Sequence, residues 1–171
     1  MIELVDLRYV HLGASSAANA SQWAQEIYGL EEVARENGRI YLRGDDRDHN
    51  ICYFDGDPKD NTVGVEVADY DALDRAAAHL EANGVDVTWG DAEGAAIRRC
   101  MKYLTFRDPT GNKFDLVVRP FASGRRYFPS RDAGVHWFNH IGLKTTDAPR
   151  DEKFWCTRFN FTANDWIGDA P

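Results

Sequence analysis

Hydrophobic positions along this chain alternate between two spacings, and the same succession of spacings occurs twice. Residues 4–14 alternate with period two, which predicts a strand. Apolar side chains then recur at helical spacing and predict one helix face, closed by Gly29: Ala20, Trp23, Ala24, Ile27 and Tyr28. Three short strands are expected next, at 31–35, 39–43 and 50–54, and Asn37-Gly38 predicts a hairpin turn between the first two.

The second succession starts at residue 62. A strand at 62–67 is followed by a helix that Asp69 is expected to cap, with an apolar face of Leu73, Ala76, Ala77 and Leu80. A strand at 85–89, a loop broken by glycines, and strands near 101–107 and 112–118 complete the set. The turn Asp108-Pro109-Thr110-Gly111-Asn112 joins the last two strands. The pattern predicts an α+β fold with two β-α-β-β-β units, 4–54 and 62–118, whose curved mixed sheet surrounds a cavity.

A third copy begins after a linker rich in proline, glycine and arginine. A constant shift in residue number pairs Tyr9 with His140, Leu12 with Leu143, Trp23 with Phe154 and Leu30 with Phe161, without a gap. We therefore expect a complete domain at 1–118, a linker at 119–134, and the start of a second, truncated domain at 135–171. Residues 166–171 resemble the passage from a strand into a turn, so the sequence is expected to be a fragment of a longer protein.

Charge and composition narrow the function classes. The net charge of −8 disfavours nucleic acid and anionic membranes as partners. Three cysteines without C-x-x-C spacing predict reduced thiols, and the acidic amino terminus lacks a signal peptide, so we expect a cytoplasmic protein. The Rossmann, Walker, H-E-x-x-H and G-x-S-x-G patterns are absent from the sequence.

The doubled unit, the helix ending Ile27-Tyr28-Gly29-Leu30 and the turn at 108–112 with its following strand resemble the vicinal oxygen chelate superfamily. This superfamily includes glyoxalase I, bleomycin-resistance proteins and type I extradiol dioxygenases. The linker and the third unit, which opens on Asn139-His140-Ile141-Gly142-Leu143, are most similar to two-domain extradiol dioxygenases. The resemblance implies ring cleavage of a catecholic diol by O₂ at an Fe(II) or Mn(II) centre, in aromatic-compound degradation by a homo-oligomer. It also implies that the amino-terminal domain is not catalytic.

The superfamily's metal-ligand positions map onto Tyr9, Thr62 and Asp115 in the complete domain. Tyrosine and threonine are poor substitutes for the two histidines of a 2-His-1-carboxylate site, so we expect no catalytic metal there. In the third unit the first-ligand position holds His140, which is the candidate metal ligand. The resemblance places the other ligands and the acid/base residues beyond residue 171, and it implies that the 171-residue chain alone is inactive.

The remaining histidines have plainer interpretations. His11 is expected to be partly buried against the cavity, and His49 to lie at the surface or the cavity rim. His79 is expected to be solvated, and His136 to pack at the end of the linker. Asp115 is expected to be a hydrogen-bonded sheet residue.

Two other functions remain open at this stage. The first is a metal-free protein that binds an aromatic ligand in the cavity of residues 4–118, as drug-resistance members of the superfamily do. The second is a glyoxalase-type isomerase or lyase with its metal at a subunit interface. Uptake of an aromatic ligand without metal would favour the metal-free binding protein. Metal analysis of a protein extended past residue 171 would help to distinguish the dioxygenase from the isomerase or lyase.

Overall fold

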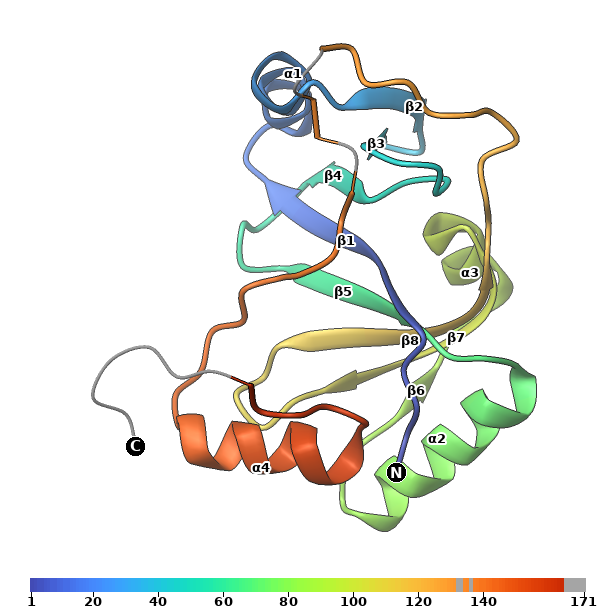
Figure 1. Ribbon diagram of the computed structural model, residues 1–171, viewed down its shortest axis with the longest axis vertical. Coiled ribbons are helices and arrows are strands. Elements are labelled where there is room, and N and C mark those ends of the chain that lie inside the picture. The colour runs from blue at the N-terminus through green and yellow to red at the C-terminus, as the bar shows by residue number, and fades with distance from the viewer. Residues whose placement is uncertain (132–133, 136, 165–171) are drawn as a thin grey trace.

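The computed structural model describes residues 1–131, 134–135 and 137–164. Among these residues it contains one eight-stranded sheet and four helices (Figure 1). The strands are β1 (Asp6–Ala14), β2 (Glu31–Glu36), β3 (Arg39–Arg43), β4 (Ile51–Asp55), β5 (Asn61–Glu66), β6 (Thr88–Trp89), β7 (Cys100–Arg107) and β8 (Lys113–Pro120). The helices are α1 (Ala17–Tyr28), α2 (Tyr70–Ala82), α3 (Ala92–Arg98) and α4 (Ala148–Arg158).

The sheet is made of two similar halves that meet at β1 and β5. The strand order is β2-β3-β4-β1-β5-β8-β7-β6. In the first half β1 pairs in parallel with β4, and in the second half β5 pairs in parallel with β8, while β1 and β5 join the halves antiparallel. This is the doubled β-α-β-β-β arrangement, and the predicted α+β fold with paired units in a curved mixed sheet is confirmed.

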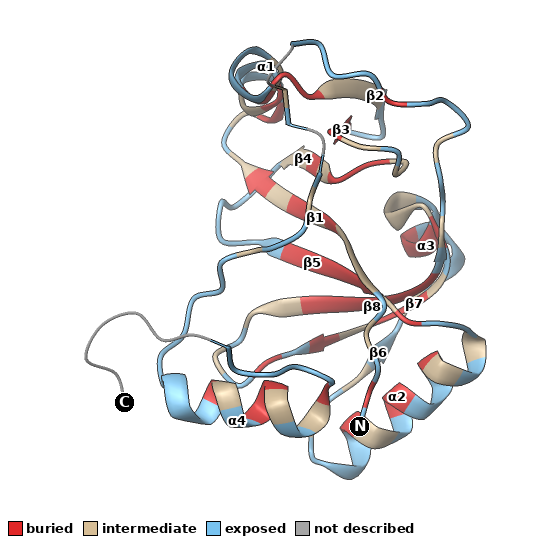
Figure 2. Ribbon diagram, in the orientation of Figure 1, coloured by how far each residue is buried: buried red, intermediate tan, exposed pale blue. Residues whose placement is uncertain are grey.

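Alternate residues of β8 divide the protein into two layers. Phe114, Leu116 and Val118 belong to the largest hydrophobic core, together with the buried faces of α2 and α4. Val117, one position out of phase, packs on the opposite face of the sheet with Tyr9 and with Ala95 of α3. Helix α3 therefore lies on the concave side of the sheet, while α2 and α4 cover the other side (Figure 1). The red segments along the middle strands in Figure 2 mark how completely both faces are buried there.

Helix α1 buries a different face from the one its hydrophobic spacing predicts. Ala17, Ser21 and Ala24 are buried. Trp23, Ile27 and Tyr28 are 50%, 53% and 45% exposed. Small side chains let the helix lie close to the sheet, so the expected apolar face is wrong for its three large members. Gly29 ends the helix as expected, in the left-handed conformation (φ 71°), and Ser16 caps its amino end.

The region between β6 and β7 also departs from the prediction. The expected strand at 85–89 is reduced to Thr88–Trp89, because only these two residues pair with β7. The expected glycine-broken loop after it is wrong, because α3 occupies residues 92–98. The side chain of Asp91 accepts a hydrogen bond from the Gly94 amide and caps this helix.

The third unit reproduces its helix but not its strand. Helix α4 begins at Ala148 after the capping residue Asp147, the positions equivalent to Ala17 and Ser16 of α1. The segment 137–145, equivalent to β1, forms no strand because no strand of the described chain pairs with it. Phe154 and Trp155 of α4 instead pack into the core of the second half of the sheet. The division into domains at 118 and 134 stays a prediction.

The described helices include none that is both long and apolar enough to cross a membrane. Cys52, Cys100 and Cys156 are all free thiols, as expected.

Candidate functional site

Two of the three residues at the superfamily's metal-ligand positions meet in the interior. Tyr9 on β1 donates a hydrogen bond from its hydroxyl to Oδ2 of Asp115 on β8, at 2.9 Å. Tyr9 is 1% exposed and Asp115 is fully buried. Thr62 is not part of this contact. It lies opposite His11 in the β1–β5 register, whereas Gly64 lies opposite Tyr9.

Gly64 makes the contact between Tyr9 and Asp115 possible. It stands between the two residues in the sheet, paired with Tyr9 on one side and with Asp115 on the other. A Cβ atom at this position would lie 2.2 Å from Cζ of the Tyr9 ring. The absence of a side chain therefore lets the ring lie flat across β5 and reach the carboxylate.

Arg98 of α3 supplies the positive charge for Asp115. Its Nε lies 2.6 Å from Oδ2, and the Thr105 hydroxyl lies 2.6 Å from Oδ1. Burial disfavours the charged guanidinium, but the carboxylate of Asp115 outweighs it and raises the pKa of Arg98. Burial, together with the charge of Asp115, raises the pKa of Tyr9 well above its ordinary value. Asp115 is therefore an ion-paired, hydrogen-bonded sheet residue, in keeping with the prediction for it.

This arrangement does not fit a divalent metal ion. A guanidinium stands beside the one carboxylate, and the tyrosine offers it a proton rather than a lone pair. Within residues 1–131, 134–135 and 137–164, no three His, Cys, Asp or Glu side chains form a group that could hold a metal ion.

Arg98 was not among the predicted site residues, because it lies in α3, where the sequence predicted a loop. Its guanidinium also stacks over the Tyr103 ring, 3.9 Å from the centroid. Gly94 of the same helix touches this tyrosine so closely that a Cβ would lie 2.0 Å from its hydroxyl. The signal that was present is Asp91 followed by an alanine-rich run, a helix cap followed by good helix formers.

A histidine pair lies beside this cluster, on the same concave face. Nε2 of His11 is 3.1 Å from Nε2 of His49, and each residue is 4% exposed. Nδ1 of His49 lies 3.2 Å from Asp48, which also binds Arg99. Burial lowers the pKa of both histidines, that of His11 well below its ordinary value. His11 is therefore more buried than expected, and His49, which was expected at the surface or the cavity rim, is also buried.

His140 lies far along the chain from this cluster, on the exposed segment that precedes α4. Its Nδ1 is 2.8 Å from Oδ1 of Asn139. It lines a cavity of about 520 Å³ together with residues 4–7 at the start of the chain. Among the described residues, His140 belongs to no group of three or more His, Cys, Asp or Glu side chains that could hold a metal ion. Of the other histidines, His79 is half-buried rather than solvated, and His136 lies outside the described residues.

Comparison with curated proteins identifies relatives of one kind, although no protein-family model matches the chain. The chain is 29% identical over 166 residues to an iron-dependent extradiol dioxygenase of Rhodococcus jostii, covering 91% of this chain and 55% of that protein. It is 29% identical over 126 residues to a biphenyl-2,3-diol 1,2-dioxygenase of Paraburkholderia xenovorans, covering 69% and 42%. The chain thus spans about half the length of the curated relatives it matches.

Solved structures share the fold. A halotolerant catechol dioxygenase, BphC, has a TM-score of 0.80 at 21% identity, over 92% of this chain and 55% of that one. A Mn(II)-bound glyoxalase from Novosphingobium aromaticivorans has a TM-score of 0.82 at 20% identity, over 97% and 56%. Together with the curated relatives, these similarities confirm the resemblance to the vicinal oxygen chelate superfamily.

Proposed function

We propose that this chain is the amino-terminal part of a metal-dependent extradiol dioxygenase that cleaves a catecholic ring with O₂. The observation that carries the proposal is the similarity to the iron-dependent extradiol dioxygenase, which extends over 91% of this chain but only 55% of that relative. The repeat supports it, because the helix of a third unit follows His140 at the spacing by which α1 follows Tyr9.

In this proposal the two halves of the sheet are a scaffold without a catalytic metal. The Arg98–Asp115 ion pair lies at the position that corresponds to the superfamily's metal site, and α3 packs against the concave face of the sheet beside it. Their role is to support the unit that begins at residue 135. Iron or manganese is the expected metal, since relatives are described as iron-dependent and manganese-dependent dioxygenases.

His140 is the proposed contribution of this chain to the metal site. Asn139 positions the ring through Nδ1, which leaves Nε2 as the coordinating atom. The metal, once bound by His140 and by ligands from the rest of the protein, would act as a Lewis acid and redox centre toward the diol and O₂. Because His140 is the one metal ligand that this chain is proposed to supply, we expect the 171-residue chain alone to be inactive.

Ring cleavage of 2,3-dihydroxybiphenyl with added Fe(II) tests the proposal. We expect no product from the 171-residue chain and turnover from the protein extended to the length of its relatives. In the extended protein, His140→Ala should abolish iron retention and turnover, whereas the matched variant His11→Ala should keep both. Turnover by the short chain, or an active His140→Ala variant, would refute it.

A cytoplasmic homo-oligomer is part of the same proposal. Three free thiols support a reducing compartment. Trp23, Ile27 and Tyr28 on the exposed face of α1 support a contact between copies. Light scattering on Trp23→Ser and Ile27→Ser variants tests the contact, and an unchanged mass in both would exclude α1 from it.

A further inference from the structure

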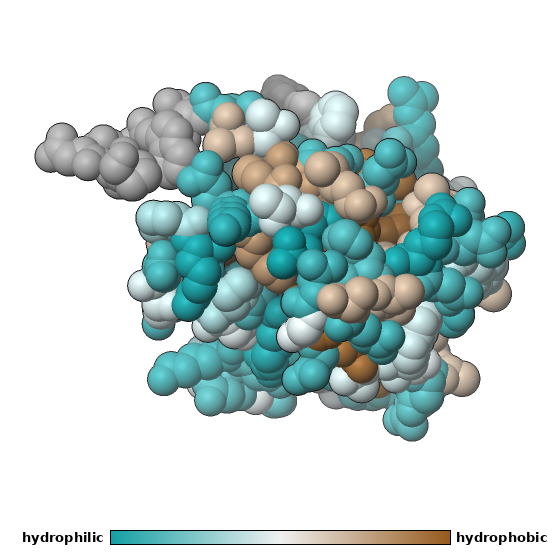
Figure 3. Space-filling model, turned by 90° about the horizontal axis from the view of Figure 1, so that it is seen from below, coloured by the Kyte–Doolittle hydropathy of each residue, from teal (hydrophilic) through white to brown (hydrophobic). Residues whose placement is uncertain are grey.

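The connecting segment, residues 121–131, follows β8 and lies against the first unit of the sheet. It passes β2 and reaches α1 before the chain descends to α4 (Figure 1). The face that carries α4 and α2 is shown from below in Figure 3, where hydrophobic residues gather in patches between hydrophilic ones. The contacts of the connecting segment with the first unit are instead mostly polar, and they come from β3, from the loop after β3 and from the end of α1.

Arg43 of β3 is the centre of these contacts, and its side chain is only 2% exposed. Its guanidinium pairs with Glu31 of β2 at 2.8 Å. It also donates hydrogen bonds to the Ser123 hydroxyl and, at 2.9 Å, to the backbone oxygen of Arg125. A buried guanidinium has lost its hydration, so it is stable only where fixed acceptors replace the water. Two of its acceptors belong to the connecting segment, so Arg43 ties this segment to the sheet.

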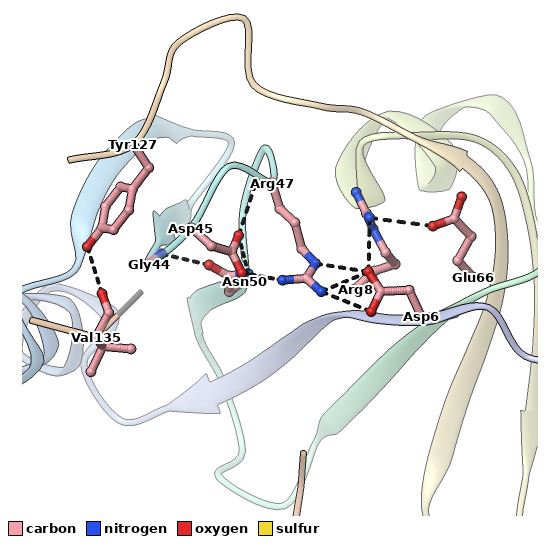
Figure 4. A network of polar contacts seen from close by, with 9 residues as sticks. All are labelled: Asp6, Arg8, Gly44, Asp45, Arg47, Asn50, Glu66, Tyr127 and Val135. Atoms are coloured by element: carbon pink, nitrogen blue, oxygen red, sulfur yellow. Dashed lines mark hydrogen bonds and ion pairs between the residues drawn. The ribbon is translucent and has the colours of Figure 1, made fainter. Parts of the chain in front are cut away.

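The loop between β3 and β4 adds a second attachment. Asp46 accepts a hydrogen bond from the Tyr127 amide at 2.9 Å, and Arg47 forms an isolated bridge with Ala122. The guanidinium of Arg47 is fixed in turn by the carboxylate of Asp6, at 2.8 and 2.9 Å (Figure 4). The loop that holds the connecting segment is therefore itself attached to β1.

The carboxyl end of α1 is the third attachment. The Ser130 hydroxyl donates a hydrogen bond to the backbone oxygen of Gly29 at 3.1 Å. The guanidinium of Arg131 donates to the backbone oxygens of Glu26 and Ile27. A cation beside the last carbonyl groups of a helix is favourable, because these groups have no partner within the helix.

Tyr127 extends the constraint toward His140. Its ring is 8% exposed, and the Arg43 guanidinium lies 5.7 Å from the ring centroid. Its hydroxyl donates a hydrogen bond to the backbone oxygen of Val135 at 3.0 Å (Figure 4). On the other side of His140, Ile141 packs against the largest hydrophobic core. His140 is therefore held between two residues that are each anchored to the domain.

We propose that Arg43 is a positioning residue for His140. It fixes the connecting segment on the first unit, and through Tyr127 and Val135 it determines where the chain places the His140 ring. The first unit thus takes part in metal binding at a distance, without supplying a ligand. The inference rests on the proposed function only in that His140 is a metal ligand.

Limited digestion of the 171-residue chain with trypsin tests the attachment of the segment. Arg125 and Arg126 are exposed cleavage sites within it. Arg43→Met removes the hydrogen bonds but keeps much of the stem volume, and it should speed cleavage there by about tenfold, because hydrogen bonds to a charged group no longer hold the segment closed. Arg39→Met on the same strand is the matched control, since the Arg39 guanidinium lies over the Phe54 ring, and its cleavage rate should stay within about twofold of wild type.

The protein extended to the length of its relatives tests the positioning. Arg43→Met should release iron to a chelator about tenfold faster and lower kcat, with KM for 2,3-dihydroxybiphenyl within about twofold, because the change displaces a metal ligand rather than a contact of the diol. Arg43→Lys keeps the charge beside Glu31 and one hydrogen bond, so its iron release should fall between wild type and Arg43→Met. Circular dichroism and cleavage confined to the connecting segment distinguish its detachment from global unfolding.

Each part of the proposal can fail separately. Equal cleavage rates in Arg43→Met and Arg39→Met would overturn the attachment. Faster cleavage in Arg43→Met with unchanged iron release and kcat would overturn the positioning of His140 and leave the proposed function intact. An extended wild-type protein that neither retains iron nor cleaves the diol would refute the proposed function, and the positioning of a metal ligand would fall with it.

Discussion

Replacing Arg98 with methionine is the sharpest test of the ion pair in the concave face. The carboxylate of Asp115 is fully buried, and Arg98 is the cation within hydrogen-bonding distance of it. Methionine keeps most of the stem volume but leaves the buried charge, among the described residues, with the hydroxyls of Tyr9 and Thr105 as its side-chain partners. Breaking one side of a buried pair costs about 3–5 kcal/mol. At roughly 2–4 °C per kcal/mol for a chain of this size, the melting temperature should fall by about 6–20 °C.

Urea denaturation at pH 7 measures the change in the free energy of unfolding. Asp115→Asn in the Arg98→Met background should recover part of the loss, because the amide carries no charge that the missing guanidinium would have to balance. The control is Arg75→Met on the exposed side of α2, which should stay within about 0.5 kcal/mol of wild type. A loss below about 1 kcal/mol in Arg98→Met, or no recovery in the double variant, would show that the ion pair does not stabilise the fold in this way.

Three further predictions concern the neighbours of this pair. Gly64→Ala places a methyl group against the Tyr9 ring and should cost about 1–3 kcal/mol, whereas Gly124→Ala, with open space around it, should be nearly neutral in the same urea assay. Asp91→Ala removes the cap of α3 and should cost about 1 kcal/mol with faster amide exchange in residues 92–98; unchanged exchange would contradict the assigned cap. Burial lowers the pKa of His11 and His49, so the unfolded chain takes up protons first and stability should fall as the pH drops below about 6.5. His49→Gln should flatten that slope between pH 7 and pH 5, and an equal slope in both proteins would exclude the pair as its source.

The local signals of the sequence predicted much of this fold. Asp69 caps its helix, Gly29 takes a positive φ at the end of α1, and Asn37-Gly38 forms a turn with both residues left-handed. Each of these features is determined by residues that are neighbours in the sequence, so it can be predicted from the sequence alone.

The parts that were missed depend on distant contacts. Spacing alone could not show that α1 turns Ala17 and Ala24 to the sheet and Trp23 to water, because the choice follows from how closely the helix approaches the strands. The glycines between β6 and β7 favour a loop locally, yet Gly94 lies within α3, where the Tyr103 hydroxyl leaves no room for a side chain. The ion pair between Arg98 and Asp115 could not be predicted, because α3 brings together two residues that no local pattern connects.

The Arg98–Asp115 ion pair lies where the superfamily's metal-ligand positions map, and we predict that the pair of units binds no catalytic metal there. Anaerobic addition of Fe(II) to the 171-residue chain, followed by desalting and iron quantification, tests it most directly. Iron well below one ion per chain is the predicted result, both for the wild type and for Asp115→Asn. Retention of one iron per chain that is lost in Asp115→Asn would place a metal at Asp115 and contradict the account.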